Sequence, residues 1–216
     1  NITFVGESRD KTVVSYANNE VFNPHPSNIS TNERPGTFPS RRAAFAADNC
    51  SGLHFSNFTI QTTAKGQAEG FLIMGKENIL QNMHIIGSGD ALQANGSVYL
   101  DNCKIDGDGD TFLSRGPAFF HRCEISSVGT FAWMRNTAEN HGATLLECKL
   151  KCRGTDTEIA RAPSNKGKEY PYCEVVLINC QLQGISPTGW GDVSKDASNV
   201  HYWEYNSTNL ADGKPI

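Results

Sequence analysis

The chain has 216 residues, a net charge of −4 and a hydrophobic content of 38%. This length fits one domain with a sizeable buried core, so we expect residues 1–216 to form a single domain. The small acidic balance, without a basic run that carries interleaved aromatic residues, argues against a nucleic-acid partner. No apolar run approaches the roughly 20 residues of a membrane helix, so we expect no membrane span.

The sequence begins without Met, directly in the strand-like run Asn1–Val5, which indicates the mature or trimmed part of a longer protein. We therefore expect that an N-terminal segment is missing from it. The seven cysteines are an odd number, which argues against a complete disulfide framework. Cys152 and Cys173 flank an excursion rich in Pro, Gly and Lys. They would bridge in an oxidising compartment, and the sequence leaves their pairing open.

Five short segments that each close on a cysteine repeat along the chain. They end at Cys50, Cys103, Cys123, Cys148 and Cys180. The last four are followed two residues later by Ile or Leu, and Met83 holds the same position in a run without a cysteine. Repeats of this kind predict a solenoid. We expect the five cysteines and Met83 to point inward, as small buried hydrophobic side chains.

The repeats consist of short β-rich runs separated by Asn, Gly, Ser and Asp, with almost no amphipathic helical stretch. They predict an all-β fold, a right-handed parallel β-helix whose rungs stack at roughly 4.8 Å. Residues 1–16 are expected to form the first rung and 17–41 a long loop. Further rungs then continue to about residue 182, with excursions at 135–142 and 152–173.

Insertions in solenoids gather on one face, which is usually the binding face. The rungs that carry the excursions also carry most of the polar clusters, and we interpret these clusters as one cleft. Its members are Asp90, Asp106, Asp108, Asp110, Arg115, Trp133, Arg135, Asn136, His141 and Arg161.

Two C-terminal stretches, Gly184–Trp190 and Tyr202–Ser207, resemble the Pro-x-Gly-Trp and Ala-Glu-Tyr-x-Asn motifs of pectin methylesterases. Asn1–Gly6 and Lys11–Val14 are similar to an early rung of that family, and the resemblance spans nearly the whole chain. The family consists of carbohydrate esterases that hydrolyse methyl esters of polygalacturonate on a parallel β-helix. The resemblance implies an acidic plant cell-wall polysaccharide as partner and a secreted, periplasmic or cell-surface location. We expect a monomer without cofactor or metal ion.

The resemblance also assigns roles to residues. The family's Gln-Asp-Thr-Leu motif falls on 109–112, so Asp110 matches the general acid/base. Its Asp-Phe-Ile-Phe-Gly motif falls on 130–134, where Thr130 holds the position of the nucleophilic aspartate. Its Leu-Gly-Arg-Pro-Trp motif falls on 159–163, so Arg161 matches the arginine that orients a carboxylate. The two glutamines that stabilise the oxyanion fall near Ser88 and on Gly109.

Ester hydrolysis requires a nucleophile, an acid for the leaving methoxide and donors for the oxyanion. Asp110 can serve as base for a water or for the Thr130 hydroxyl, while Arg161 holds a uronate carboxylate. Asp108 lies two residues from Asp110, on the same face if the segment is a strand, so the two carboxylates can divide base and acid roles. Further substrate contacts are expected from Trp133 as a stacking platform, and from Ser88, Asp90, Arg115, Arg135, Asn136 and His141.

Other interpretations remain open at this stage. Asp106, Asp108 and Asp110 also fit a polar turn or a calcium-like loop without its completing Glu. With an Arg base, such a loop would serve a polysaccharide lyase. A protein that kept the cleft and lost the nucleophile would bind oligouronates without hydrolysing them.

Overall fold

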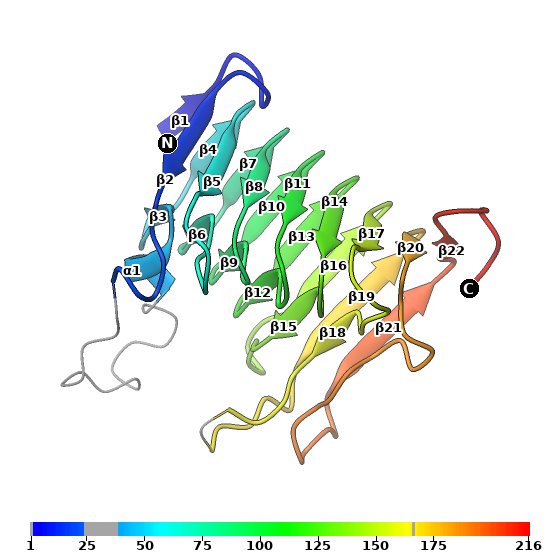
Figure 1. Cartoon of the computed structure of the whole chain (residues 1–216). Coiled ribbons are helices and arrows are strands. Elements are labelled where there is room, and N and C mark those ends of the chain that lie inside the picture. Colours follow the sequence, from blue (N-terminus) through cyan, green and yellow to red (C-terminus); the bar gives the residue numbers. More distant parts are fainter. Residues whose placement is uncertain (1, 24–38, 166) are drawn as a thin grey trace.

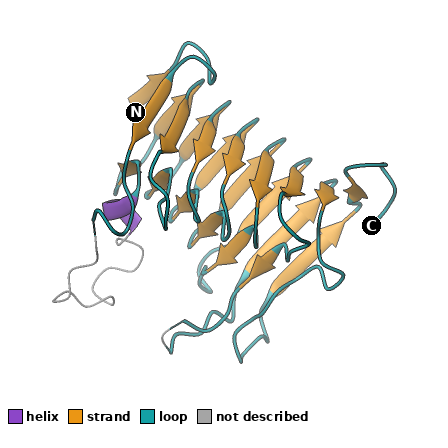
Figure 2. Cartoon of the chain, in the orientation of Figure 1, coloured by secondary structure: helices purple, strands orange, loops and turns teal. Residues whose placement is uncertain are grey.

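The structure is a computed structural model that describes residues 2–23, 39–165 and 167–216. Over these residues the chain winds into a right-handed parallel β-helix, as the repeats predict (Figure 1). The described helix is short, α1 (Pro39–Arg42), and it lies beside the N-terminal rungs (Figure 2). Within the described ranges no helix has the length and apolarity needed to cross a membrane.

The strands form three parallel sheets that run the length of the coil. Sheet A contains β1 (Ile2–Val5), β4 (Leu53–Ser56), β7 (Asn78–Gln81), β10 (Val98–Asp101), β13 (Ala118–His121), β16 (Ala143–Leu146), β19 (Glu174–Ile178) and β21 (His201–Tyr205). Sheet B contains β2 (Val13–Tyr16), β5 (Thr59–Thr62), β8 (His84–Ile86), β11 (Lys104–Asp106), β14 (Glu124–Ser127), β17 (Lys149–Cys152), β20 (Gln181–Gln183) and β22 (Thr208–Asn209). Sheet C contains β3 (Phe45–Ala47), β6 (Phe71–Ile73), β9 (Leu92–Ala94), β12 (Phe112–Ser114), β15 (Ala132–Met134) and β18 (Ala160–Arg161).

The predicted rung boundaries hold in part. The first rung, β1 and β2, lies where the sequence places it. Of the predicted loop 17–41, residues 24–38 lie outside the described residues, and α1 begins before the loop was expected to end. The predicted excursion 152–173 is not a simple loop, because it contains β18, which pairs with β15 and completes sheet C.

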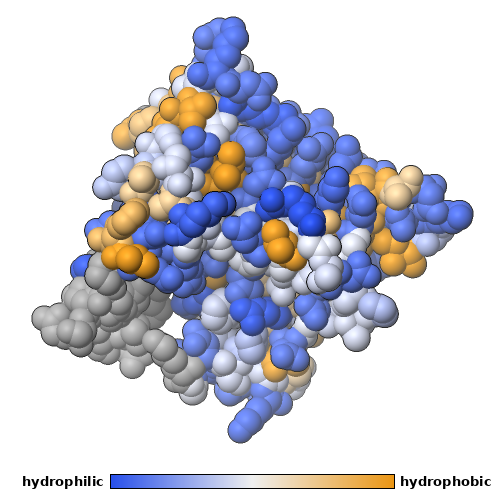
Figure 3. Space-filling view, viewed as in Figure 1, coloured by the Kyte–Doolittle hydropathy of each residue, from blue (hydrophilic) through white to orange (hydrophobic). Residues whose placement is uncertain are grey.

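The interior is built from aligned side chains because every rung keeps the same register. Sheet B contributes one inward residue from each rung, as in Ile85, Ile105 and Ile125, which pair directly across β8, β11 and β14. Sheets A and C face them with Leu and Phe ladders, including Phe120 and Phe112. At the start of the coil, β1 and β2 end their sheets, and their apolar side chains are exposed over the N-terminal rungs (Figure 3).

The cysteine ladder is real but begins elsewhere than predicted. Met83 and the last four cysteines of the repeat, at 103, 123, 148 and 180, are buried inside the turn between sheets A and B. Each of these thiols donates to a carbonyl of the preceding rung, at 3.4 to 3.6 Å. The prediction for Cys50 was wrong: Cys50 is exposed at another corner, and the equivalent inward position is held by Phe58.

The two cysteines outside the ladder do not form a disulfide. Cys152 and Cys173 are both free thiols. The Cys152 thiol donates to the Thr155 carbonyl at 2.9 Å, and the Cys173 thiol donates to the Met134 carbonyl at 3.0 Å. Local backbone acceptors thus satisfy both side chains.

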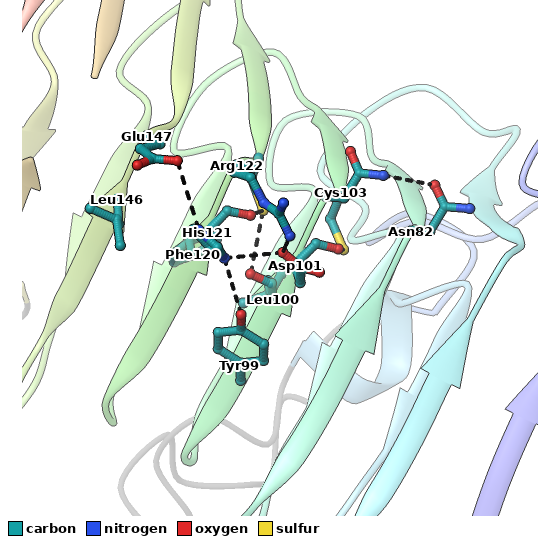
Figure 4. Close-up of polar contacts among 12 residues, drawn as sticks. Asn82, Tyr99, Leu100, Asp101, Cys103, Phe120, His121, Arg122, Leu146 and Glu147 are labelled. Atoms are coloured by element: carbon teal, nitrogen blue, oxygen red, sulfur yellow. Dashed lines mark hydrogen bonds and ion pairs between the residues drawn. The ribbon is translucent and has the colours of Figure 1, made fainter. Parts of the chain in front are cut away.

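From the second rung onward, the turn from sheet A to sheet B has one residue with positive φ in each rung. Those residues are Asn57, Asn82, Asn102, Arg122, Glu147, Asn179 and Asn206, with φ between 52° and 64°. Asn tolerates this left-handed conformation better than most residues. The asparagine amides also form hydrogen bonds along the stack. The Asn102 amide donates to Asn82 at 3.3 Å (Figure 4), and the Asn206 amide donates to Asn179 at 2.8 Å.

We expect Glu147→Asn to stabilise the protein by about 1 kcal/mol, because Asn lowers the cost of positive φ and offers an acceptor to Asn179. Urea unfolding measures the change. Glu147→Ala is the control, since it removes the same carboxylate and keeps the strained backbone. Equal unfolding free energies for the two variants would contradict the explanation.

Candidate functional site

Polar residues occupy one ladder position along the edge of sheet C. The residue two positions before each of β6, β9, β12, β15 and β18 is respectively Glu69, Asp90, Asp110, Thr130 and Glu158. Because the rungs stack in register, the backbone atoms at equivalent positions lie about 4.8 Å apart along the axis of the coil. The fold thereby brings together residues from five rungs, of which the sequence analysis singled out three.

Asp110 and Arg161 form a bidentate ion pair. Asp110 has left-handed backbone geometry, with φ of 45°. Its two carboxylate oxygens accept hydrogen bonds from Nε and Nη2 of Arg161, at 2.8 and 2.5 Å. Such bidentate pairs are strong and fix both side chains. The structure therefore brings together the two residues that the motifs place at the centre of the site.

Trp133 lies under two guanidinium groups. Its register partner on β18 is Arg161, whose guanidinium carbon is 5.1 Å from the ring centroid. The guanidinium of Arg135 is closer, at 3.8 Å. Trp133 Nε1 is buried without a hydrogen-bond partner among the described residues. The indole thus joins the site through cation–π contacts, while its role as a sugar platform stays a prediction.

A second charged cluster lies on the neighbouring rungs. Arg42, from α1, donates from Nε and Nη2 to the Glu69 carboxylate at 2.8 and 2.7 Å, and from Nη2 to Asp90 at 3.1 Å. The Gln67 amide donates to Asp90 at 3.3 Å. The side chains of Glu69 and Asp90 are 0% and 7% exposed, so two buried carboxylates share one cation.

Burial and this shortage of positive charge together set the pKa of Asp90. Burial, followed by the negative charge of Glu69, raises the pKa of Asp90 to about 7, although Arg42 opposes the shift. Asp110 adds to the increase from the next rung. Near neutral pH the site therefore holds a carboxyl group that can donate a proton. Sequence reasoning predicted a contact role for Asp90 and missed Glu69 and Arg42; the recurrence of an acid two residues before β6, β9, β12 and β18 was the available signal.

Thr130 has a different neighbour from the one expected. Its hydroxyl donates to Glu158 at 3.5 Å, a long hydrogen bond. Among the described residues no hydrogen bond joins it to Asp110. The sequence interpretation, in which Asp110 activates the Thr130 hydroxyl, has no direct contact to support it.

The three aspartates of 106–110 are not brought together. Asp106 lies on β11 and contacts His84 at 2.6 Å. Asp108 contacts Arg153 at 3.5 Å and accepts a long hydrogen bond from Ser88, also at 3.5 Å. Residues 108–110 form a bend, so Asp108 and Asp110 do not share a strand face as expected. Within the described ranges no group of three metal-ligating side chains is present, so the calcium-like loop finds no support.

Asn136 and His141 are also placed away from Asp110. The Asn136 side chain is buried, donates to the Tyr172 carbonyl at 2.6 Å and accepts from the Glu174 amide at 3.2 Å. It holds a loop and has little capacity left for a ligand. The His141 side chain is 87% exposed and contacts Glu174 at 3.2 Å. Both residues follow β15, where the chain turns the corner from sheet C to sheet A.

The outer face of sheet A carries a hollow of about 510 Å³ lined by Tyr99, Phe119 and His141, among others. The Tyr99 and Phe119 rings stack with centroids 5.9 Å apart, so each covers a face of the other. Nearby, Asp101 contacts His121 at 3.2 Å and accepts from Arg122 at 2.8 Å (Figure 4). This network offers no candidate nucleophile, and we place the candidate site on sheet C.

Comparisons with known proteins find relatives by structure alone. No family model matches the chain, and no curated protein matches its sequence. Pectin methylesterase from carrot superposes with a TM-score of 0.79 at 18% identity, over 99% of this chain and 69% of that one. The enzyme from Yersinia enterocolitica gives 0.78 at 15% identity, over 99% and 82%. A pectin methylesterase in complex with a hexasaccharide gives 0.72 at 13% identity, over 99% and 79%. The chain therefore has the fold of pectin methylesterases.

We expect Arg42→Gln to destabilise the protein by about 3 to 5 kcal/mol at pH 8, because Glu69 and Asp90 would then be buried without a cation. Urea unfolding at pH 8 measures the loss. The loss should shrink at pH 5, where Asp90 is protonated. The adjacent, exposed Arg41→Gln is the control, with an expected change below about 0.5 kcal/mol. Similar losses for both variants would show that the cluster is not what Arg42 stabilises.

Proposed function

We propose that this protein is a carbohydrate esterase that hydrolyses methyl esters of uronic acids in pectin-type polysaccharides. The observation that carries the proposal is the pairing of two carboxyl groups on neighbouring rungs of sheet C. Asp110 is paired with a guanidinium, and Asp90 has a pKa of about 7. A carboxyl group with a pKa near 7 is suited to the role of general acid, and a neighbouring carboxyl group can then serve as the base. The likeness to pectin methylesterases supports the choice of substrate class.

In the proposed mechanism Asp110 is the general base. It takes a proton from a water that attacks the ester carbonyl, and Arg161 orients its carboxylate through their bidentate pair. Asp90 donates its proton to the methoxide as the bond between the carbonyl carbon and the methoxide oxygen breaks. The products are methanol and a uronic acid, which releases its remaining proton to the solvent and becomes the free uronate carboxylate. Transfer of a proton from Asp110 to Asp90 restores the starting state.

Donors for the developing oxyanion are present although the family's glutamines are absent. Trp133 Nε1 is a buried N–H without a partner among the described residues, and Nη1 of Arg161 is not used in the pair with Asp110. Removal of one such donor typically costs 10²- to 10³-fold in rate. These groups are our candidates for the role, and Arg161 can also orient the uronate as the motifs imply.

One observation favours a second candidate, a silent oligouronate-binding protein. Both oxygens of Asp110 already accept hydrogen bonds from Arg161, and Thr130 supplies no carboxylate beside them. Arg161 thus occupies the carboxylate oxygens that a general base would need to reach the attacking water. In that case the same face of sheet C would bind uronates of the plant cell wall without turnover.

We expect the protein to release methanol from methylated galacturonan, and Asp110→Asn to lower the rate by about 10²-fold or more, because the base is lost. Thr130→Val is the matched control on the next rung and should keep most of the activity. Enzyme-coupled methanol detection measures each rate. Oligouronate binding without methanol from any methylated uronide would support the silent protein, and an unsaturated product absorbing in the ultraviolet would support a lyase.

The pH dependence tests the role of Asp90. Its proton is needed for the leaving group, so kcat/KM should fall as pH rises through about 7. Asp90→Asn should lose about 10²-fold of the rate and this pH limb. The folded-state pKa is raised, so the stability linked to Asp90 is present below pH 4 and lost between about pH 4 and 7. Thermal unfolding of Asp90→Asn should lack that slope. An unchanged pH limb in the variant would remove Asp90 from the mechanism.

A further inference from the structure

We propose that Arg115 and Arg135 form a subsite for a free carboxylate, which seats a non-esterified uronate residue beside the ester that reacts at Asp110. The nature of the reacting ester rests on the proposed function. The subsite itself rests on the charges and hydrogen bonds of this face of sheet C. It predicts a substrate that is partly, not fully, esterified.

The two arginines occupy the same ladder position on neighbouring rungs. Arg115 directly follows β12 and its amide donates to the Ala94 carbonyl; Arg135 directly follows β15 and its amide donates to the Ser114 carbonyl. Their backbones therefore lie about 4.8 Å apart along the stack. Two guanidinium groups in this arrangement repel each other unless an anion lies against them.

Neither arginine has an acidic partner among the described residues. Arg42 and Arg161 on the same face bind Glu69 and Asp110, but no described carboxylate lies within 4.0 Å of Arg115 or Arg135. Both side chains are partly buried. Burial, followed by the charge of Arg115, lowers the pKa of Arg135 to about 10. Burial lowers the pKa of Arg115 too, although a hydrogen bond with the Tyr170 side chain opposes that shift. The structure thus holds two adjacent, partly desolvated cations, an arrangement that costs free energy without an anion.

Unused hydrogen-bonding groups beside the two cations fit a sugar acid. Arg115 Nε is a buried donor without a partner, and Gln93 Oε1 is a buried acceptor without one, within the described part of the chain. Gln93 shares an outward ladder with Trp133, on which Arg135 packs. A uronate presents a carboxylate to the donors and hydroxyl groups to the acceptor. A methyl ester offers the same hydroxyls but no charge, so it would leave both guanidinium groups uncompensated.

The position of the pair connects it to the reacting groups. Asp90 and Asp110 both act on the charge of Arg135 through space. Their oxygens are engaged by Arg42 and Arg161, so they do not occupy the subsite. A polyuronate lying across the rungs would therefore place one sugar at Asp110 and a neighbouring free acid at the arginine pair.

Calorimetric titration with trigalacturonate, the fully de-esterified trimer, tests the subsite without requiring turnover. We expect binding to weaken by about tenfold or more in Arg115→Gln and in Arg135→Gln, because each removes a charged hydrogen-bond donor. The matched control is Arg122→Gln, an exposed arginine paired with Asp101 at another corner, which should bind within about twofold of the wild type. The fully methylated trimer should bind the wild type and Arg135→Gln equally.

Arg135→Lys is a second control, because it keeps a cation on a side chain of similar length. Its affinity for trigalacturonate should lie between those of the wild type and Arg135→Gln. Thermal unfolding shows whether each variant is folded. Equal binding of trigalacturonate by folded wild type and Arg135→Gln would overturn the subsite, as would equal weakening of the methylated trimer. Arginine-dependent binding without methanol release would keep the subsite and overturn the esterase. Methanol release without arginine-dependent binding would keep the esterase and overturn the subsite.

Discussion

The fixed register between rungs is the constraint on which the rest of this structure depends. Every described strand of sheets A, B and C pairs in parallel with its equivalent in the next rung. From the second rung onward, one residue of positive φ at each turn from sheet A to sheet B keeps the turns alike. Equivalent side chains must therefore stack at about 4.8 Å, whatever their chemistry. Inside the coil this produces ladders of Ile, Leu, Phe and Cys. On the outside of the coil, the same register places residues of like charge next to one another on consecutive rungs.

The charges of sheet C follow from this enforced stacking. Glu69, Asp90 and Asp110 lie on consecutive rungs, and like charges at that spacing repel. The two cations that relieve them come from outside the ladder, Arg42 from α1 and Arg161 from β18. They neutralise the two ends of the row. The middle acid, Asp90, shares its cation with Glu69, and burial together with the charge of Glu69 raises its pKa. Register thus places three acids side by side, and the middle one has a pKa raised to about 7.

The periodicity of the sequence predicts which residues hold equivalent positions in successive rungs. It does not predict contacts between a rung and a segment outside the repeat. The Met83 and cysteine positions, and the register that aligns Asp110 with Thr130, follow from spacing alone, because neighbouring rungs have nearly equal length. Cys50 was misplaced because its segment ends at a different corner, where its local sequence looks the same. The partnership of Arg42 with Glu69 joins a loop to a rung 27 residues later, so no local pattern encodes it. His141 and Asn136 share their sequence neighbourhood with Trp133, but the corner after β15 separates them from it.

The same register explains how Thr130 fits the site. A carboxylate at position 130 would lie between Asp110 and Glu158, which would make three consecutive acids beside the single guanidinium of Arg161. Threonine interrupts that row. Arg161 therefore extends across the intervening rung and binds both carboxylate oxygens of Asp110 through Nε and Nη2. Relative to the motifs that the sequence resembles, the carboxyl pair then lies one rung nearer the N-terminus, at Asp90 and Asp110 rather than at 110 and 130. In the proposed mechanism the lost aspartate is therefore compensated by the preceding rung, which supplies an acid at the equivalent position.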